Sequence, residues 1–219
     1  MNKSFGNEDP RLERYISSTY GPEDAVLLEI RERSRSAGLP EIQVGPLDAR
    51  HLEVLTRACG ARRAIEIGTL GGYSGVAILR GLQPGGVLDT FELDPQHARV
   101  AEESFRRAGF AKQARVHVGP ALEGLMRLDG EGPFDLCFID ADKTGYPRYL
   151  DWAARNLRPG GIVIGDNAFL FGAVGSGAAE SSDPPLEAMH GFHERLARSG
   201  EFRATVLPTG EGMAVGVRL

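Results

Sequence analysis

Cysteine and histidine are both sparse in this chain of 219 residues. The two cysteines, Cys59 and Cys137, lie in apolar surroundings and have no partner at the spacing of a metal site. We interpret them as reduced thiols of the protein core. The histidines are scattered without ligand spacing, which predicts surface or structural roles for His51, His97, His117, His190 and His193. The composition therefore gives no support to a site built from cysteine and histidine ligands.

Long apolar runs and an excess of positive charge are also missing. No apolar run approaches the ~18 residues that a membrane span requires, and the first ten residues lack the apolar core of a signal peptide. Asp and Glu number 30 against 25 Lys and Arg, which gives a net charge of −5 and a pI of about 5.6. Nucleic acid and anionic membranes favour a basic surface. We therefore expect a cytoplasmic protein that binds neither nucleic acid nor membrane.

Composition and periodicity predict one α/β domain over residues 1–219. Hydrophobic residues make up 42% and charged residues 25%, which is typical of a globular chain long enough to bury a full core. Apolar residues at helical spacing predict an N-terminal helical segment over residues 1–60, with Leu28 and Val54 among those facing inward. Over residues 61–219 strands alternate with helices. This alternation predicts a mostly parallel sheet with helices on both faces.

The bounds of the expected elements follow from periodicity and from glycine and proline stops. We expect helices over 11–19, 22–37, 46–59, 73–82, 95–108, 121–126, 146–157 and 186–198, and strands over 64–68, 86–92, 114–118, 134–139 and 161–164. Residues 202–207 and 212–219, separated by Pro-Thr-Gly-Glu, predict a C-terminal antiparallel hairpin. Residues 172–185 contain many Gly, Ala and Ser, which predicts a surface loop.

Two of the expected strands end in oxygen-bearing side chains. The mostly apolar segment 134–139 leads into Asp140, Asp142 and Lys143, and the apolar run 162–164 leads into Asp166 and Asn167. Carboxylate and amide oxygens suit a hard cation such as Mg²⁺ or Ca²⁺ better than zinc. A lysine beside such a site could remove a proton from a hydroxyl held at the cation. The alternatives are a simple turn at Asp166-Asn167, a helix cap at Asp142 and a solvated lysine.

A glycine-rich turn follows the first expected strand, at residues 66–74 (Glu-Ile-Gly-Thr-Leu-Gly-Gly-Tyr-Ser). Glycine lets the backbone approach a ligand closely, and Glu92, at the end of the next strand, can accept both hydroxyls of a ribose. The turn is not G-x-G-x-x-G, and Glu66 would repel a pyrophosphate. A cofactor with a cationic amino acid end, such as S-adenosylmethionine, therefore fits better than a dinucleotide. A metal-independent methyltransferase, a nicotinamide-dependent oxidoreductase and a non-catalytic S-adenosylmethionine-binding protein remain alternatives.

In their order and spacing these segments resemble the cation-dependent O-methyltransferases, of the catechol and caffeoyl-coenzyme A type, and their small bacterial relatives. The resemblance covers about residues 40–219 and rests on the turn at 65–74, on Asp140-Ala141-Asp142-Lys143 and on Asp166-Asn167, with a weaker match over 207–213. It implies a Rossmann-like class I methyltransferase fold with a seven-stranded sheet. By position, it implies that the residues binding S-adenosylmethionine are Val44, Glu66, Gly68, Thr69, Tyr73, Ser74, Glu92, Leu93, Pro120, Ala121, Asp140 and Asp142.

The resemblance also implies a reaction. A divalent cation, Mg²⁺ or alternatively Ca²⁺ or Mn²⁺, would be held by Asp140, Asp166 and Asn167 and would chelate an aromatic vicinal diol. Lys143 would be the base that frees one hydroxyl for methylation. Relatives that dimerise imply a homodimer whose N-terminal helices help cover the active site. The chain departs from the family where relatives carry a Trp soon after the Asp-Asn pair, because residues 168–172 are Ala-Phe-Leu-Phe-Gly, and it has Glu-Gly at 211–212 in place of Asp-Gly.

Overall fold

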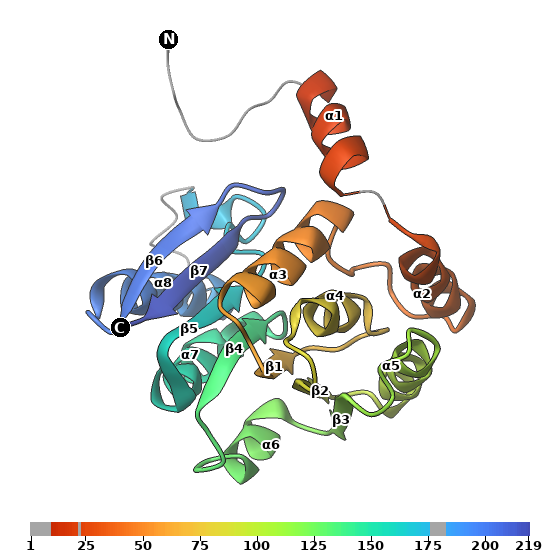
Figure 1. Cartoon of the computed structure of the whole chain (residues 1–219). Helices are drawn as coiled ribbons and strands as arrows, with labels where there is room; N and C mark the ends of the chain where they lie inside the picture. Colours follow the sequence, from red (N-terminus) through yellow and green to blue (C-terminus); the bar gives the residue numbers. More distant parts are fainter. Residues whose placement is uncertain (1–9, 22, 176–182) are drawn as a thin grey trace.

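The computed structural model describes residues 10–21, 23–175 and 183–219, and these form one sheet flanked by helices (Figure 1). The strands are β1 (Arg63–Ile67), β2 (Val87–Glu92), β3 (Ala114–Val118), β4 (Phe134–Ile139), β5 (Leu157–Gly165), β6 (Phe202–Leu207) and β7 (Met213–Arg218). The α-helices are α1 (Pro10–Tyr20), α2 (Ala25–Ser36), α3 (Pro46–Ala58), α4 (Tyr73–Gly81), α5 (Pro95–Arg107), α6 (Ala121–Arg127), α7 (Tyr146–Asn156) and α8 (Pro184–Arg198).

The sheet has seven strands in the order β3-β2-β1-β4-β5-β7-β6, which confirms the predicted fold class. Strands β1 to β5 pair in parallel, whereas β7 runs antiparallel to both of its neighbours, β5 and β6. The strand order reverses between β1 and β4, because the chain first builds outward to β3 and then returns to the other side of β1. In open α/β sheets a ligand crevice forms beyond the carboxyl ends of the strands at such a point.

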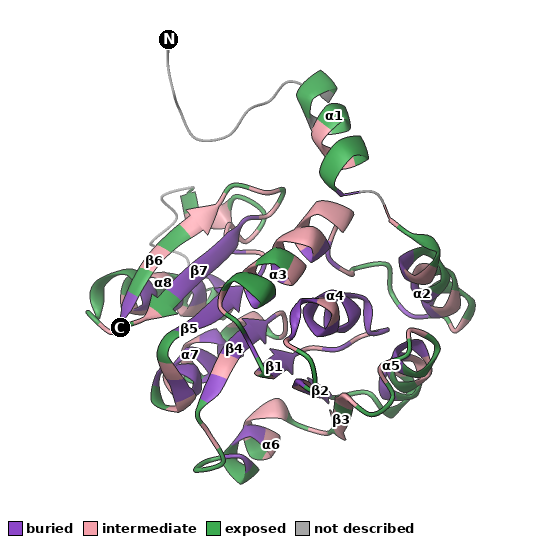
Figure 2. Cartoon of the chain, in the orientation of Figure 1, coloured by how far each residue is buried: buried purple, intermediate pink, exposed green. Residues whose placement is uncertain are grey.

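The sheet separates two hydrophobic cores. Alternate residues of a strand point to opposite faces, so Ala64 joins one core while its neighbour Ile65 joins the other. Helices α2, α3, α4 and α5 supply the first core, and α6, α7 and α8 supply the second. Figure 2 shows that burial is concentrated on the central strands and on α4, whereas α1 projects from the body and is largely exposed. Among the described helices, none is both long and apolar enough to span a bilayer.

The structure differs from expectation in two helix faces and one strand. Leu28 and Val54 are 52% and 55% exposed, because the buried stripe of α2 runs through Leu27 and Ile30 and α3 buries Leu52. Helix α2 begins after its N-cap Asp24, whose side chain accepts the Leu27 N–H at 3.0 Å. Strand β5 begins at residue 157 because this residue pairs with Phe134 ahead of a register shift. Of the expected loop 172–185, residues 176–182 lie outside the described part of the chain, as do residues 1–9 and 22.

Candidate active site

A cavity of about 970 Å³ lies at the carboxyl ends of β1, β2 and β4, at the upper end of the range typical of small-molecule sites. Helix α2 and residues 40–44 contribute to its wall, as do residues 119–122 and 140–143. The predicted site residues that line it are Val44, Gly68, Thr69, Tyr73, Ser74, Glu92, Leu93, Pro120, Ala121, Asp140, Asp142, Lys143 and Asn167. Residues far apart in the sequence thus share one cavity, and the two predicted residues absent from its wall are Glu66 and Asp166.

Gly68 is required by the close approach of β1 and β4. Its φ is +95°, and a Cβ at this position would lie 1.9 Å from the Asp140 carbonyl oxygen. The two strand ends are joined there, since the Asp140 N–H donates to the Ile67 carbonyl at 2.8 Å. Gly71 is similarly constrained, because a Cβ would lie 2.0 Å from Ser34 Oγ on α2. The glycines therefore let β4 and α2 pack against the turn, which holds the cavity wall together.

The Glu92 carboxylate is held at the end of β2 by the turn that it faces. Oε2 accepts the Leu70 N–H at 2.8 Å and Oε1 accepts the Asp94 N–H at 2.9 Å. A carboxylate has about four acceptor positions, so each oxygen keeps capacity for a further donor. His97 Nδ1 lies 3.6 Å from Oε1, and His97 also lines the cavity. The geometry suits a carboxylate that receives hydroxyl donors from a ligand.

Glu66, predicted to line the cofactor pocket, lies behind its wall. The residue is fully buried, and its two carboxylate oxygens accept the hydroxyls of Ser74 and Thr90, each at 2.6 Å. Thr90 in turn is hydrogen-bonded to Thr69, which lines the cavity. Burial raises the pKa of Glu66 from its usual 4.5 to about 7, although the two hydroxyl donors oppose this shift. Glu66 therefore reaches the cavity only through the Ser74 and Thr69 side chains that it helps to orient.

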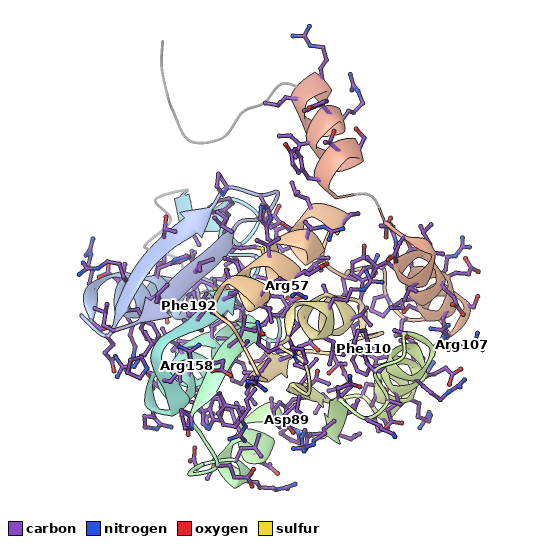
Figure 3. The ribbon with its side chains drawn as sticks, viewed as in Figure 1. Arg57, Asp89, Arg107, Phe110, Arg158 and Phe192 are labelled. Atoms are coloured by element: carbon purple, nitrogen blue, oxygen red, sulfur yellow. The ribbon has the colours of Figure 1, made fainter. Side chains whose placement is uncertain are left out.

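Acidic and basic side chains meet where β4 and β5 end. Lys143 Nζ lies 3.6 Å from Asp140 Oδ1 and donates to the Tyr146 hydroxyl at 2.5 Å. The Tyr146 hydroxyl lies 2.9 Å from the Asp166 carbonyl oxygen and 3.1 Å from the Ile139 carbonyl oxygen, which share its single proton. Tyr146 is fully buried, and Phe192 of α8 packs edge-on against its ring. Figure 3 labels Phe192. The Lys143 ammonium is thus fixed relative to both strand ends.

The electrostatics of this region indicate two carboxylates close to each other in a poorly solvated place. Burial raises the pKa of Asp140, and the nearby Lys143 opposes the shift. Burial and the charge of Asp140 together raise the pKa of Asp166 to about 7. Burial also lowers the pKa of Lys143 below its ordinary 10.5, against the pull of the acidic neighbours. The group has a net negative charge when all three are ionised, which a cation would compensate.

Asp142 differs from its predicted role as a helix cap. It occupies the N-cap position of the short 3₁₀ turn Lys143–Gly145, but its side chain accepts no backbone N–H there. Instead, Oδ1 accepts the Tyr149 hydroxyl at 2.6 Å and Oδ2 accepts the Thr144 hydroxyl at 3.1 Å. These bonds orient Asp142 at the edge of the cavity, where Tyr149 also contributes to the wall.

The N-terminal helices were expected to help cover the active site, but no residue of α2 was predicted to line it. Ile30, Arg31 and Ser34 line the cavity, and the Tyr73 hydroxyl donates at 2.8 Å to Glu23, which also accepts a hydrogen bond from Arg31 at 3.0 Å. The helical periodicity of the segment gave no sign of this role, because the bond between Tyr73 and Glu23 joins residues 50 positions apart in the chain. Phe171, also in the wall, carried a signal, since it lies just past Asp166-Asn167.

The chain is similar to proteins of known class over most of its length. A family model described as O-methyltransferase matches residues 15–219. The chain belongs to this O-methyltransferase family. Proteins named catechol O-methyltransferase from Niastella koreensis and Mycobacterium tuberculosis are each 38% identical to it, over 90% and 91% of this chain and 89% of each relative. The solved O-methyltransferase from Bacillus cereus in complex with SAH has a TM-score of 0.88 at 35% identity and covers 95% of this chain and 97% of its own.

An O-methyltransferase from Streptomyces achromogenes, solved in complex with SAM, is similar at a TM-score of 0.87 and 35% identity, covering 95% of this chain and 96% of its own. Membership of the O-methyltransferase family confirms the resemblance based on the glycine-rich turn and the two acidic strand ends. It also removes the nicotinamide-dependent oxidoreductase from the alternatives. Whether a cation is needed, and which acceptor is methylated, must be inferred from the residues that form the site of this O-methyltransferase.

Proposed function

We propose that this O-methyltransferase transfers the methyl group of S-adenosylmethionine to one hydroxyl of a metal-chelated aromatic vicinal diol. The observation that carries the proposal is that Asp140, Asn167 and Lys143 line the same cavity as the glycine-rich turn and Glu92. Asp166, behind the cavity wall, lies close enough to Asp140 for the two charges to interact. The products would be a methyl ether and S-adenosylhomocysteine. Relatives named catechol O-methyltransferase support the choice of a diol.

The residues around the glycine-rich turn support S-adenosylmethionine as the methyl donor. Glu92 would accept the two ribose hydroxyls, with its orientation already set by the Leu70 and Asp94 N–H groups. Gly68 leaves the backbone open to the amino acid end of the cofactor. Pro120 and its neighbours would lie near the adenine. The SAH and SAM complexes of the two solved relatives support this choice of cofactor.

Asp140, Asp166 and Asn167 fit a divalent cation. Two carboxylates and an amide are hard oxygen donors, which suit Mg²⁺ first and Mn²⁺ or Ca²⁺ as alternatives. Among the described residues no group of three His, Cys, Asp or Glu side chains could hold a metal, but this set includes Asn167. The raised pKa values of Asp140 and Asp166 show that burial disfavours both charges together, which a bound cation would offset. When bound, such a cation would hold both hydroxyls of a diol and lower the pKa of one of them.

Lys143 is the candidate base for the acceptor hydroxyl. Burial lowers its pKa, so the neutral amine is more accessible near neutral pH than in a solvated lysine. Tyr146 holds the Lys143 nitrogen beside Asp140, and hence beside the proposed position of the acceptor. Lys143 would take the hydroxyl proton as the oxygen becomes a nucleophile. The remaining catalytic contribution would come from holding the two substrates in a reactive orientation.

Removal of divalent cations tests this proposal. We expect activity on a panel of catechols to disappear in excess EDTA and to return with Mg²⁺. Asp140→Ala should lose activity at all Mg²⁺ concentrations, whereas Asp151→Ala, on a half-exposed face of α7, should behave as wild type. Full activity of the Asp140→Ala protein in EDTA would instead support a metal-independent methyltransferase, the remaining alternative of the same class.

We also propose that the protein is a homodimer in which the N-terminal helices help cover the active site. Helix α1 projects from the body (Figure 1), and it exposes Tyr15 and Tyr20, each 60%, while α3 exposes Val54. Exposed apolar side chains of this size on one part of a molecule are typical of a protein interface. Light scattering should give twice the chain mass of 23.6 kDa. A 23.6 kDa particle at micromolar concentration would reject the dimer.

A further inference from the structure

We propose that Glu211 is a positioning residue that fixes the turn 167–171 and thereby sets the Phe171 ring at the mouth of the cavity, where it contacts an apolar substituent of the acceptor. The inference rests on the proposed function and adds a substrate class to it, namely diols whose ring carries an apolar group. Phe171 is the proposed specificity residue, and Glu211 acts through it.

Three hydrogen bonds attach the turn to residues 211 and 212. The Ala168 N–H donates to the Gly212 carbonyl at 2.9 Å, and the Phe169 N–H donates to the Glu211 carbonyl at 2.9 Å. The Phe171 N–H donates to the Glu211 carboxylate, Oε2, at 2.8 Å. The first two bonds need only the backbone of any residue. The third needs an acceptor on the side chain of residue 211, so it links the identity of this residue to the placement of Phe171.

The backbone of the turn needs such support. Asn167, Leu170 and Phe171 have φ values of +51°, +47° and +53°, in the left-handed region that residues other than glycine rarely adopt. Such conformations persist only where the surroundings impose them. The packing of Phe169 adds to this support, since a Cβ at Gly212 would lie 2.7 Å from the Phe169 ring. The turn therefore has a defined shape that depends on residues 211 and 212.

The shape of the turn determines what the cavity presents to an acceptor. Phe171 lines the same cavity as Asn167 and Lys143, yet it is 77% exposed. Ile42, also in the wall, is 71% exposed. Residues 168–171, Ala-Phe-Leu-Phe, carry no charge, and the Glu211 carboxylate accepts the Phe171 N–H. A large exposed aromatic ring at the mouth of a ligand cavity suits an apolar partner, which here is a substituent that projects outward from the diol ring.

The test compares catechol, which is compact, with 4-phenylcatechol, which carries an apolar ring. In the wild type we expect a lower KM for 4-phenylcatechol than for catechol. Phe171→Ala and Glu211→Ala should each raise the KM for 4-phenylcatechol about tenfold, with little change for catechol. Glu211→Gln should match the wild type, because its amide oxygen still accepts the Phe171 N–H. The double variant Phe171→Ala/Glu211→Ala should be no worse than Phe171→Ala alone, since Glu211 acts through Phe171.

Matched controls separate this role from a general loss of stability. Met126→Ala, 68% exposed on α6 away from the cavity, and Glu194→Ala, on the exposed face of α8, should leave both KM values unchanged. Calorimetry should give wild-type affinity for S-adenosylhomocysteine in every variant. If Glu211→Ala does not fold, Phe171→Ala and Glu211→Gln still decide the question, because an unchanged ratio of KM values in Phe171→Ala overturns the inference.

Two further results would contradict the inference. It fails if Glu211→Ala raises both KM values equally, or if its effect is undiminished in the Phe171→Ala background. If the wild type methylates both diols and none of the variants changes the ratio of the two KM values, the inference is refuted but the proposed function stands. A wild type that methylates neither diol with Mg²⁺ present refutes the proposed function, and the inference with it.

Discussion

Replacing Glu66 with glutamine should change the pH dependence of stability. The free energy of unfolding of Glu66→Gln should increase relative to that of wild type as the pH rises. Glu66 is fully buried and accepts hydrogen bonds from Ser74 and Thr90. Glutamine has nearly the same shape and cannot ionise, so the substitution removes a buried charge without opening a cavity. Its amide oxygen can accept one hydroxyl, and its NH₂ group can donate to the other.

The size of the effect follows from the pKa shift. Burial raises the pKa of Glu66 from 4.5 to about 7 in the folded state. Between these values the folded protein holds a proton that the unfolded chain has released, so the folded state loses stability as pH rises through this window. A shift of this size corresponds to about 3 kcal/mol, at about 1.4 kcal/mol per pH unit. The glutamine side chain of the variant has no such dependence.

Urea unfolding of the two proteins at several pH values measures the difference. From about pH 5 to about pH 8, we expect the free energy of unfolding of Glu66→Gln to rise relative to wild type by about 2–3 kcal/mol. Other titrating groups change the stability of both proteins, and their contributions largely cancel in the difference. Glu194→Gln, an exposed substitution on α8, controls for the loss of a negative charge.

A difference in the free energy of unfolding between wild type and Glu66→Gln that stays constant over this pH range would contradict the prediction. The opposite slope, with the variant losing stability relative to wild type as pH rises, would also contradict it. That result would mean that the hydroxyl donors Ser74 and Thr90 favour the ionised carboxylate more strongly than burial disfavours it.

Three further predictions concern the cofactor site, the base and the stability of the fold. Glu92→Ala should weaken S-adenosylhomocysteine binding by about 1.5–3 kcal/mol in calorimetry, because a charged acceptor is lost, and unchanged affinity would count against the ribose role. Lys143→Met should keep cofactor affinity but lose about 10²–10⁴-fold in turnover, and a rate within a few-fold of wild type would make Lys143 a bystander. Asp135→Asn should lower the free energy of unfolding by about 1–3 kcal/mol near neutral pH, because the carboxylate accepts hydrogen bonds from Arg158 at 2.6 Å and from two backbone N–H groups. Equal midpoints of urea unfolding for the variant and the wild type would contradict this prediction.

The stabilisation by Asp135 should also depend on pH. Burial acts to raise the pKa of Asp135, but the hydrogen bond from Arg158 and the N–H groups of Arg62 and Arg63 outweigh burial and leave the pKa below its usual 3.8. The stabilisation is therefore present above about pH 4 and is lost as pH falls through the lower, folded-state pKa.

Local sequence was enough to predict the sheet and the polar side chains that gather at its carboxyl edge. Strand and helix periods are properties of neighbouring residues, so the alternation of elements, the turn at Gly68 and the acidic ends at Asp140 and Asp166 could be recognised one segment at a time. Parallel strands share one carboxyl edge, which is why these separate segments were expected to meet. The family resemblance then supplied the proposed roles of individual residues.

Tertiary structure decided which side of each segment faces the site. The period of a helix shows that one face is apolar but not what covers it, so Leu28 was expected inside and is exposed, while Arg31 and Ser34 of the same helix line the cavity. Glu66 lies on a strand whose residues alternate between faces, and only the packing of Ser74 and Thr90 shows that its carboxylate turns away from the cavity. These positions depend on contacts between distant segments, and such contacts are fixed only when the sheet and its helices pack together.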